Sequence, residues 1–441
     1  MKNSGVEWIG EIPDDWEISK TKYLTKLYTG NSIKDEEKNL YEDKADAVPY
    51  ISSKDINATF STTNYENGMY VKHSDNSFVR APAGSTLMCI EGGSAGKKKT
   101  FLNQEVCFVN KLCCFSPIKI DNKFLFYCLN SPNYEEEFRF NISGMIGGVS
   151  VGKLNQFILP KPPKETQQRI ASYLDKKCSK IEETIQNQQQ VIEKLKAYKQ
   201  SLITEAVTGK VKIENGKACG EYESYKDSGV EWIGKIPSGW ISTRVGHLYK
   251  SMLGKMVCPN QLTEEHSLQK YLCAMNVHFD GVDLSEIKGM WFTPNEMNQY
   301  QVRNGDLLVV EGGAGAGGAS IVYGLSENDK IFIQNSIHLV KPVKTNYLPK
   351  YLYYWIYSLV KQNYIDYTCN KATIPHFTKE KLEGMPIAIS DKITQQEIIV
   401  YLDKKCTAID TTIEQKQNLI EKLTEYKKSL IYECVTGKKA V

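Results

Sequence analysis

The sequence contains no apolar run that approaches the roughly 18 residues of a membrane-spanning helix, and its polar first residues do not resemble a secretory signal. It has twelve cysteines but no CxxC pair, and its six histidines are dispersed, so we expect neither a disulfide framework nor a metal site. We expect reduced thiols that fill core space in a cytoplasmic protein. Because the net charge is only +3, any polyanion would have to bind a local patch.

What the sequence does have is an internal duplication. Three segments return at a nearly constant offset: SGVEWIGEIPDDW (4–16) as SGVEWIGKIPSGW (228–240), TQQRIASYLDKKC (166–178) as TQQEIIVYLDKKC (394–406), and EKLKAYKQSLITEAVTGK (193–210) as EKLTEYKKSLIYECVTGK (421–438). Each half therefore has a near-identical start, a divergent middle and a near-identical end.

The divergent middles still share a frame. TLMCIEGG (86–93) parallels DLLVVEGG (306–313), and FLFYCLNS (124–131) parallels YLYYWIYS (351–358). Strand-like runs that end in glycine clusters, followed by aromatic runs that suit a packed helix or strand, predict two related α/β domains with different surfaces.

The repeated ends have the spacing of a coiled-coil seam. Apolar residues alternate at intervals of four and three, and no Pro or Gly interrupts residues 166–208 or 394–436. The seam residues are Leu174, Cys178, Ile181, Ile185, Ile192, Leu195 and Leu202 in the first copy and Leu402, Cys406, Ile409, Ile413, Ile420, Leu423 and Leu430 in the second. Each copy predicts a helix roughly 60 Å long at about 1.5 Å per residue.

The two helices are expected to cover each other's seams and to run antiparallel, because residues 210–227 are barely long enough to return along a parallel pair. Gln188 and Lys416 occupy the same central place in the two seams. They either meet and fix the register or lie at a solvated edge. Gly209 and Gly437 are the expected helix stops, and Thr394 with Glu397 predicts a capping box.

The predicted fold is α+β: two related globular α/β domains and a pair of long antiparallel coiled-coil helices, with a pseudo-two-fold internal duplication. The expected boundaries are residues 1–164 for the first domain, 165–209 for the first helix, 210–227 for a linker, 228–392 for the second domain and 393–437 for the second helix. A duplicated protein with two different middles suits a target with approximate two-fold symmetry, and duplex DNA with two half-sites is such a target.

The repeated segments SGVEWIGEIP, PPKETQQRIASYLDKKCSKIEETI and EKLKAYKQSLITEAVTGK resemble the specificity subunits of Type I restriction–modification systems, and the resemblance covers essentially the whole chain. It implies that each middle is a target-recognition domain and that the helices are a spacer that also helps to dock two methyltransferase subunits. The resemblance also implies that restriction–translocase subunits complete the enzyme. The resemblance implies no cofactor of this chain's own, since S-adenosylmethionine, ATP and Mg²⁺ belong to the partners. The second copy lacks the double proline before its helix, so the start of that helix is less well defined.

No catalytic motif is evident in the sequence. The nearest approach to an amino-methyltransferase motif is Ser131-Pro132-Asn133-Tyr134, and Ala95-Gly96-Lys97-Lys98 lacks the spacing of a phosphate loop. Gly313, Gly315 and Gly318 match a dinucleotide fingerprint, but residues 319–323 predict a strand where that site needs a helix. We therefore expect a non-catalytic DNA-binding subunit; a self-sufficient methyltransferase or nuclease and a rod-like scaffold without sequence preference are the alternatives.

Two kinds of region contain candidate DNA-binding residues, and the glycine loop of the second half is uncharged. The first is the glycine loop with its lysine run, for which phosphate contact and a merely solvated turn are both open. The second is the polar stretch before each long helix, where Lys, Asn and His side chains suit base edges but a capped turn is the simpler interpretation. The candidates are Lys97, Lys98, Lys99, Lys153, Asn155, Asn370, Lys371 and His376, with Arg80 and Arg303 before the glycine loops. The matched Trp8, Trp16, Trp232 and Trp240 are expected to have a structural role.

Overall fold

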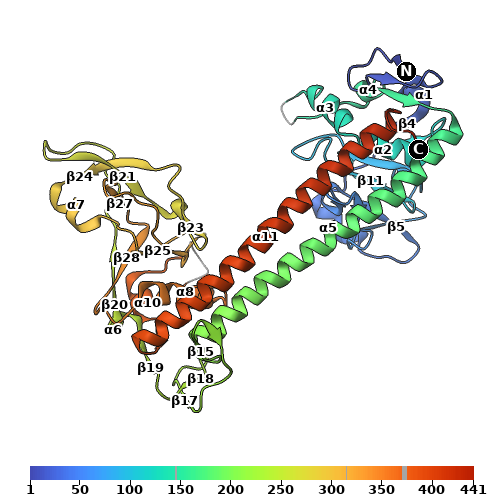
Figure 1. Cartoon of the computed structure of the whole chain (residues 1–441). Helices are drawn as coiled ribbons and strands as arrows, with labels where there is room; N and C mark the ends of the chain where they lie inside the picture. The colour runs from blue at the N-terminus through green and yellow to red at the C-terminus, as the bar shows by residue number, and fades with distance from the viewer. Residues whose placement is uncertain (145–146, 314, 370–374) are drawn as a thin grey trace. The chain divides into compact units, whose positions relative to one another are not determined.

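The computed structural model describes residues 1–144, 147–313, 315–369 and 375–441. The chain forms two compact units, of which the first is built from two segments far apart in the sequence and the second from one continuous segment (Figure 1). Unit 1 comprises Met1–Gln190 and Lys416–Val441, and unit 2 comprises Val191–Gln415. Each unit therefore contains one divergent domain and a part of each long helix. In the described ranges, no helix is both long and apolar enough to cross a lipid bilayer.

The domain of unit 1 contains two four-stranded sheets. The first is antiparallel, in the order β11 (Lys99–Phe101), β10 (Thr86–Cys89), β13 (Leu112–Pro117) and β4 (Thr25–Thr29). The second is mixed, in the order β8 (Tyr70–Lys72), β5 (Ala47–Ile51), β12 (Val106–Phe108) and β9 (Arg80–Ala81). The domain also contains the helices α1 (Thr21–Leu24), α2 (Asn122–Leu129), α3 (Pro132–Phe140) and α4 (Val151–Leu154), the paired strands β1 (Lys2–Asn3) and β2 (Glu11–Ile12), β3 (Glu17–Lys20) and β14 (Ile158–Lys161), and β6 (Ile56–Asn57) and β7 (Thr62–Thr63).

The domain of unit 2 repeats the four-stranded first sheet, and its second sheet has three strands instead of four. Its first sheet has the order β26 (Ala319–Ile321), β25 (Leu307–Val310), β28 (Ile337–Pro342) and β20 (Tyr249–Leu253), and its second has the order β24 (Lys288–Phe292), β21 (Ser267–Leu272) and β27 (Ile331–Ile333). Its helices are α6 (Val245–Leu248), α7 (Pro294–Tyr300), α8 (Pro349–Val360), α9 (Tyr364–Thr368) and α10 (Lys379–Gly384). Its paired strands are β15 (Ile213–Glu214) with β16 (Lys217–Ala218), β17 (Tyr225–Asp227) with β18 (Lys235–Pro237), β19 (Ile241–Arg244) with β29 (Pro386–Ile389), and β22 (Val277–His278) with β23 (Gly281–Val282).

The common frame predicted for the divergent middles is confirmed, with a shift of one residue in the glycine loops. Thr86 pairs with Phe115 on β13, and Leu307, not Asp306, makes the equivalent pair with Val340 on β28. The aromatic runs, for which the sequence left helix and strand open, are the helices α2 and α8. The segment after the glycines of the second domain is strand β26, as predicted, rather than the helix that a dinucleotide site requires.

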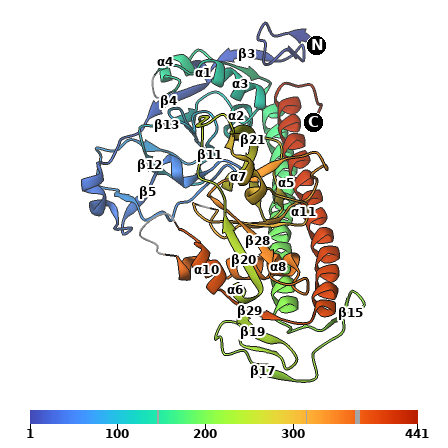
Figure 2. The ribbon, with the colours of Figure 1, turned by 90° about the vertical axis from the view of Figure 1, so that its left-hand side faces the viewer.

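Two helices of 44 residues each, α5 (Lys164–Val207) and α11 (Lys392–Val435), contribute to both units. In unit 1, Glu182 pairs with Lys427 and Gln188 with Lys416. Residue numbers along α11 therefore decrease where those along α5 increase, so the two helices run in opposite directions. The helices lie side by side in both views (Figures 1 and 2), and the predicted antiparallel pairing is confirmed.

The predicted seam residues form the contact between these helices. Ten of them are buried: Leu174, Cys178, Ile181, Ile185, Ile192, Leu202, Leu402, Cys406, Ile409 and Leu430. Leu195 and Ile413 pack more loosely on the core of unit 2, and Ile420 and Leu423 on that of unit 1. Burial of the seam stabilises each unit because it removes apolar side chains of both helices from water.

Gln188 and Lys416 contact each other, which is the first of the two alternatives given in the sequence analysis. Lys416 Nζ donates a hydrogen bond of 2.9 Å to Gln188 Oε1, and both side chains are half-buried. A shift of the helices along each other would separate these two groups and leave them without their partners, so their pairing favours a single register.

The start of α11 differs from the sequence-based expectation. Asp391 is the cap, because its carboxylate accepts hydrogen bonds from the backbone of Ile393 (2.9 Å) and Thr394 (3.1 Å). The predicted capping box of Thr394 and Glu397 is wrong, since Thr394 already lies within the helix. Glu397 instead accepts a hydrogen bond of 2.8 Å from the backbone of Gly216 in the linker hairpin.

The predicted helix stops have a second role in packing. Gly209 and Gly437 adopt left-handed φ angles of 71° and 73°, which favour glycine. A Cβ atom at Gly209 would lie 2.4 Å from Pro237 Cδ, and one at Gly437 would lie 2.4 Å from Pro13 Cδ. The end of each long helix therefore fits closely against a proline of the repeated opening segment.

The repeated tryptophans have the expected structural role. Trp16 and Trp240 are buried, and their rings lie next to Gly437 and Gly209, respectively. Trp8 is also buried and packs edge-on against a tyrosine ring, whereas Trp232 is partly exposed and packs on two aromatic rings of unit 2. Because α11 ends in unit 1, the opening segment of the first copy receives the helix end of the second.

We predict that Gly209→Ala lowers the free energy of unfolding more than Gly234→Ala does. Gly234 has a similar φ of 70°, but an added Cβ atom there would have no other atom within 4 Å. Its replacement should therefore cost only the left-handed conformation, about 1–2 kcal/mol. Gly209→Ala should add about 1–3 kcal/mol for the clash with Pro237. Urea unfolding of the two variants measures the difference, and equal losses would contradict the packing role.

Candidate nucleic-acid interface

Each domain presents two polar loops, which the sequence analysis had singled out separately. We call the described residues after β10 or β25 the glycine loop (90–98 in unit 1; 311–313 and 315–318 in unit 2). We call the described residues before α4 or α10 the second loop (141–144 and 147–150 in unit 1; 369 and 375–378 in unit 2).

In unit 1 the two loops lie against each other. Gly92 N donates a hydrogen bond of 2.8 Å to the Gly147 carbonyl, and Val149 N donates one of 3.0 Å to the Ile90 carbonyl. Strand β10 and helix α4, which is capped by the Ser150 side chain, position the ends of these loops. The loops therefore form a single surface held together by backbone hydrogen bonds.

Unit 2 builds the same contact from different residues. Gly313 N donates a hydrogen bond of 3.2 Å to the Pro375 carbonyl, and Phe377 N donates one of 2.6 Å to the Glu311 carbonyl. Beneath this contact, the Nε2–H of the buried His338 donates to the Phe377 carbonyl at 3.1 Å. Burial lowers the pKa of His338, which keeps its ring neutral at neutral pH.

The three lysines of the first glycine loop have different environments. Lys97 is exposed, and the Lys98 ammonium donates a hydrogen bond of 2.6 Å to the Ser53 carbonyl. Lys99 is only 1% exposed and begins strand β11. Its ammonium donates to Glu135 Oε1 at 2.6 Å and to the Leu129 carbonyl at 2.8 Å.

The expectation that Lys99 lies on an exposed loop is therefore wrong. Burial lowers the pKa of Lys99, while the neighbouring Glu135 carboxylate opposes that effect and favours the charged form. The pair links β11 to helix α3, so Lys99 has a structural role and only Lys97 is free to extend toward a polyanion.

The other candidates of unit 1 also divide into exposed and engaged side chains. Lys153 is exposed on α4, and Asn155, half-buried just after α4, accepts a backbone hydrogen bond of 3.2 Å from Lys22 N at its carbonyl. The Arg80 guanidinium is occupied by Glu105 (3.2 Å) and by the His73 carbonyl (2.9 Å), which does not suit the DNA-binding role considered for it.

In unit 2, Arg303 is exposed, and its backbone N–H donates to Asp306 at 2.9 Å. His376 is exposed at the contact of the two loops, with its Nδ1 atom 3.4 Å from Glu311 Oε1, while its carbonyl accepts a hydrogen bond of 2.8 Å from the Lys381 ammonium. The candidates Asn370 and Lys371 lie outside the described residues.

The sequence analysis missed the polar residues that attach each domain to its long helix. The buried Gln167 accepts a hydrogen bond of 2.7 Å from Asp121 N, and the buried Gln395 accepts one of 3.1 Å from Leu348 N. Further along the same helices, Asp175 and Asp403 each accept a hydrogen bond of 2.6 Å from a tyrosine of α2 or α8. All four residues belong to the repeated TQQ and YLDKKC segments, and that repetition was the available signal.

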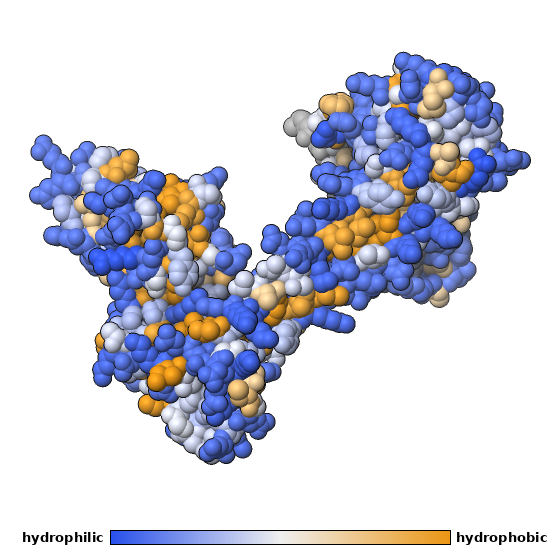
Figure 3. Space-filling model, viewed as in Figure 1, coloured by the Kyte–Doolittle hydropathy of each residue, from blue (hydrophilic) through white to orange (hydrophobic). Residues whose placement is uncertain are grey.

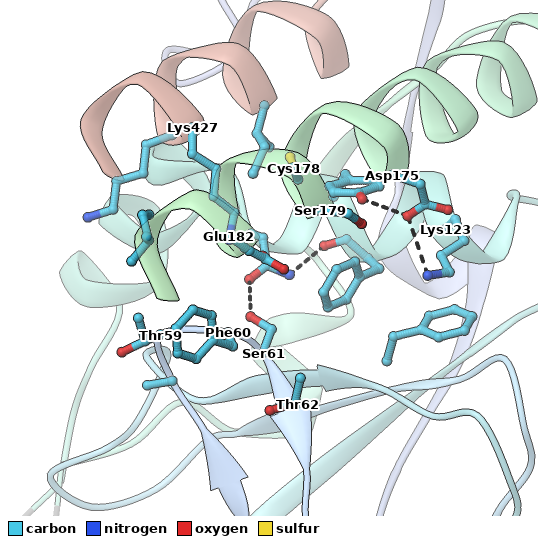
Figure 4. Close-up of a pocket in the computed structure, with 18 of the residues that line it drawn as sticks. Thr59, Phe60, Ser61, Thr62, Lys123, Asp175, Cys178, Ser179, Glu182 and Lys427 are labelled. Atoms are coloured by element: carbon cyan, nitrogen blue, oxygen red, sulfur yellow. Dashed lines mark hydrogen bonds and ion pairs between the residues drawn. The ribbon is translucent and has the colours of Figure 1, made fainter. Parts of the chain in front are cut away.

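A pocket of about 600 Å³ lies in unit 1 between the β6–β7 hairpin and the long helices. Figure 4 shows Asp175, Cys178, Ser179 and Glu182 of α5 on one side and the hairpin on the other. Its lining includes Lys123, which pairs with Asp175, and Lys427, which pairs with Glu182. Since these charges neutralise each other, the pocket does not favour a polyanion.

The corresponding hairpin of unit 2, β22–β23, packs directly on helix α8. Phe279 at its turn packs on Tyr357 with ring centroids 4.9 Å apart, and its carbonyl accepts a hydrogen bond of 2.6 Å from the Tyr353 hydroxyl. The two domains thus share a frame but differ in surface shape beside the helices.

Through the parts of the chain that the structure describes, no group of three or more His, Cys, Asp or Glu side chains is placed to hold a metal ion. The polar surfaces described above consist of backbone amides, lysine, histidine and asparagine, which suit binding rather than bond-breaking chemistry. Two related domains with different loops share one frame and the same two long helices, which is the duplicated arrangement expected of the class of proteins with two recognition domains.

The comparisons with known proteins agree with this class. The sequence profile of the Type I restriction modification DNA specificity domain matches residues 13–197 and 280–424, more than half of the chain. The chain is 22% identical to the Type I restriction enzyme EcoBI specificity subunit of Escherichia coli, over 97% of this chain and 86% of that protein. It is 21% identical to the EcoKI specificity subunit of E. coli strain K12, over 97% and 90% of the two chains.

A solved structure from work on "Structural basis underlying complex assembly and conformational transition of the type I R-M system" has the same fold, with a TM-score of 0.69 at 13% identity over 97% of this chain and 100% of the other. The chain belongs to the family of Type I restriction–modification specificity subunits. It is accordingly a non-catalytic subunit with DNA specificity domains.

We predict that Lys99→Ala lowers the free energy of unfolding by about 2–4 kcal/mol, because it leaves a cavity and removes the partner of Glu135. Lys97→Ala, two residues earlier on the exposed part of the loop, should change it by less than about 0.5 kcal/mol. Chemical denaturation of both variants measures the contrast. Similar stability of the two variants would contradict the structural role assigned to Lys99.

Proposed function

We propose that this specificity subunit recognises an asymmetric bipartite DNA sequence and directs methyltransferase and restriction subunits to it. The first recognition domain (residues 1–164) reads one half-site and the second (residues 228–392) reads the other. The observation that carries the proposal is the loop contact, which repeats one hydrogen-bond pattern with different side chains: Lys97 and Lys153 in unit 1, and His376 in unit 2. A common frame with different side chains suits two readers of different sequences.

The division of labour within each surface follows from charge and geometry. Lysine ammonium groups on exposed loops neutralise phosphates and position the domain without carrying sequence information. Polar side chains of the second loop, and in unit 1 those on and just after α4, are the candidates for base edges, where donors and acceptors in the major groove distinguish the four base pairs. Methyl transfer to an adenine flipped out of the duplex, with its S-adenosylmethionine, is the task of the partner subunits.

The long helices are the proposed spacer between the half-sites. Neither α5 nor α11 contains a proline or glycine over its 44 residues, and each contributes to both units. A continuous helix has a fixed rise per residue, so its length sets the number of base pairs between the two half-sites.

The proposal is tested by selecting bound duplexes from a random pool, with the methyltransferase partner present. The expected result is two short fixed blocks separated by a constant number of unspecified base pairs. Recovery of no motif would favour a scaffold without sequence preference. Methyl transfer by the purified chain alone, with labelled S-adenosylmethionine, would contradict its non-catalytic role.

The spacer role of the long helices is tested by an insertion variant in the same selection. Seven residues inserted beside Gln188 in α5 and seven beside Lys416 in α11 keep the seam pattern and add about 10 Å of helix, or about 3 base pairs. The blocks should stay unchanged while the gap between them lengthens. Altered blocks would contradict the separation of reading from spacing.

The helices also carry a repeated surface that suits two copies of one partner. Tyr198 and Tyr426, at the same position of the two repeats, are 54% and 53% exposed. In both repeats a lysine also stacks on a tyrosine: Lys177 lies 5.8 Å from the Tyr173 ring centre and Lys405 lies 5.9 Å from that of Tyr401. Figure 3 shows hydrophobic residues among hydrophilic ones on the surface of the long helices. Partly exposed aromatic residues beside cations are frequent anchors of protein interfaces.

We predict that Tyr198→Ala and Tyr426→Ala each weaken the binding of one of two methyltransferase subunits by about 10- to 30-fold, the loss typical of an interface anchor. Native mass spectrometry should then detect mainly one bound copy for each single variant. The control is Leu40→Ala, which truncates a residue that is 78% exposed but outside the repeats. Two bound copies for both tyrosine variants at limiting concentration would refute this docking surface.

A further inference from the structure

Each domain exposes one aromatic ring at an equivalent place beside the paired loops. Phe140, the last residue of α3, is 76% exposed. Tyr367, the penultimate residue of α9, is 91% exposed. Single exposed apolar residues are ordinary, but recurrence at the same position in two divergent domains requires a common cause.

The exposure of these rings follows from an anchor two residues earlier. Phe138 is buried against Gly96, where an added Cβ atom would lie 2.5 Å from the Phe138 ring. Ile365 is buried in the same way against Gly317, where the added atom would lie 2.6 Å from Ile365 Cδ1. Residues two apart on a helix point in nearly opposite directions, because each residue turns the helix by about 100°. The anchor that faces the glycine loop therefore directs the following aromatic residue away from the core.

The backbone that carries each ring is held by hydrogen bonds. In unit 1, the Asn141 side chain donates a hydrogen bond of 2.7 Å to the Glu137 carbonyl, and Ser143 N donates one of 2.9 Å to the Gly148 carbonyl of the second loop. In unit 2, the Thr368 hydroxyl donates one of 2.8 Å to the Tyr364 carbonyl. Each ring is thus a fixed projection at the start of the second loop.

The neighbouring side chains change between the domains while the aromatic character persists. Phe140 follows Arg139, whose guanidinium lies 5.6 Å from the Phe140 ring centre, whereas Tyr367 follows Asp366. A phenylalanine ring cannot hydrogen-bond to base edges, so the property that the two rings share is a flat apolar face. Such a face stacks on bases or inserts between neighbouring base pairs.

We propose that Phe140 and Tyr367 are DNA wedges, each of which inserts its ring between two adjacent base pairs of its own half-site. The proposal rests on the bipartite reading described above and adds a readout of base-step stacking to it. Pyrimidine–purine steps unstack most easily, so each ring favours such a step at one position of its block. Each ring then contributes to specificity through the deformability of the duplex and not through hydrogen bonds.

The test uses the full chain with its methyltransferase partner and duplexes that carry 2-aminopurine at successive positions of the selected blocks. The fluorescence of 2-aminopurine increases where a base is unstacked. One position in each block should brighten, in addition to any target adenine that the methyltransferase flips. Phe140→Ala should abolish the signal in the first block only, and Tyr367→Ala that in the second only. Each variant should weaken binding by about 5- to 150-fold, the effect of losing one base stack.

Matched controls separate the wedge from general effects of a surface change. Ile118→Ala and Val343→Ala truncate residues that are 62% and 51% exposed, directly after β13 and β28. They should leave both signals intact, and Phe140→Tyr should restore the first. Thermal unfolding should show that Phe140→Ala folds as the parent does, as expected for an exposed side chain.

The outcomes distinguish this inference from the proposed function. If the unmodified complex selects two blocks but Phe140→Ala and Tyr367→Ala leave the signals and the affinity unchanged, the wedge is refuted and the bipartite reading remains. If either variant instead loses its methyltransferase subunit, the ring belongs to a protein interface and the wedge is also refuted. If the unmodified complex selects no sequence, the proposed function itself fails.

Discussion

The apolar seam of the two long helices is the constraint on which the rest of the structure depends. A helix of 44 residues with a continuous apolar stripe is not stable alone in water, and α5 and α11 bury their stripes against each other and against the domains. Because each helix contributes to both units, neither divergent domain is completed by its own half of the sequence. The central Gln188–Lys416 hydrogen bond favours one register, and equivalent residues of the repeats then make equivalent contacts.

That equivalence explains why the ends of the two halves are so similar while the middles are not. Lys199 pairs with Asp410 in unit 2 as Lys427 pairs with Glu182 in unit 1. The helix end at Gly437 fits the first opening segment as that at Gly209 fits the second. Each repeated segment therefore packs against another repeated segment, and this packing restricts the residues that either copy can have. The loops carry no such restriction, because their backbone contact tolerates different side chains.

Much of this arrangement was accessible from the sequence. The duplication follows from repeated segments, the seam from periodicity, the glycine stops from local conformational preference and the antiparallel pairing from the length of the linker, and all of these can be read from the sequence directly. The strand–loop–strand units were also predicted. Aligning the identical residues EGG of the two copies, however, placed the strands one residue away from the register that the strand pairing shows. The capping residue was misassigned because the helix begins before Thr394. Asp391 accepts hydrogen bonds from the first free backbone amides, including that of Thr394 itself.

The sequence by itself determined the duplication, the two long helices and the strands beside the glycine loops, and it left helix and strand open for the aromatic runs. Only the tertiary structure decided which lysine of the run is free, because the burial of Lys99 depends on Glu135 and Leu129, distant residues that the fold brings to it. The same holds for the engaged Arg80, for the meeting of the two loops and for the projection of Phe140 and Tyr367. Periodicity is a local property that the sequence carries directly, whereas exposure and partnership depend on contacts between distant segments.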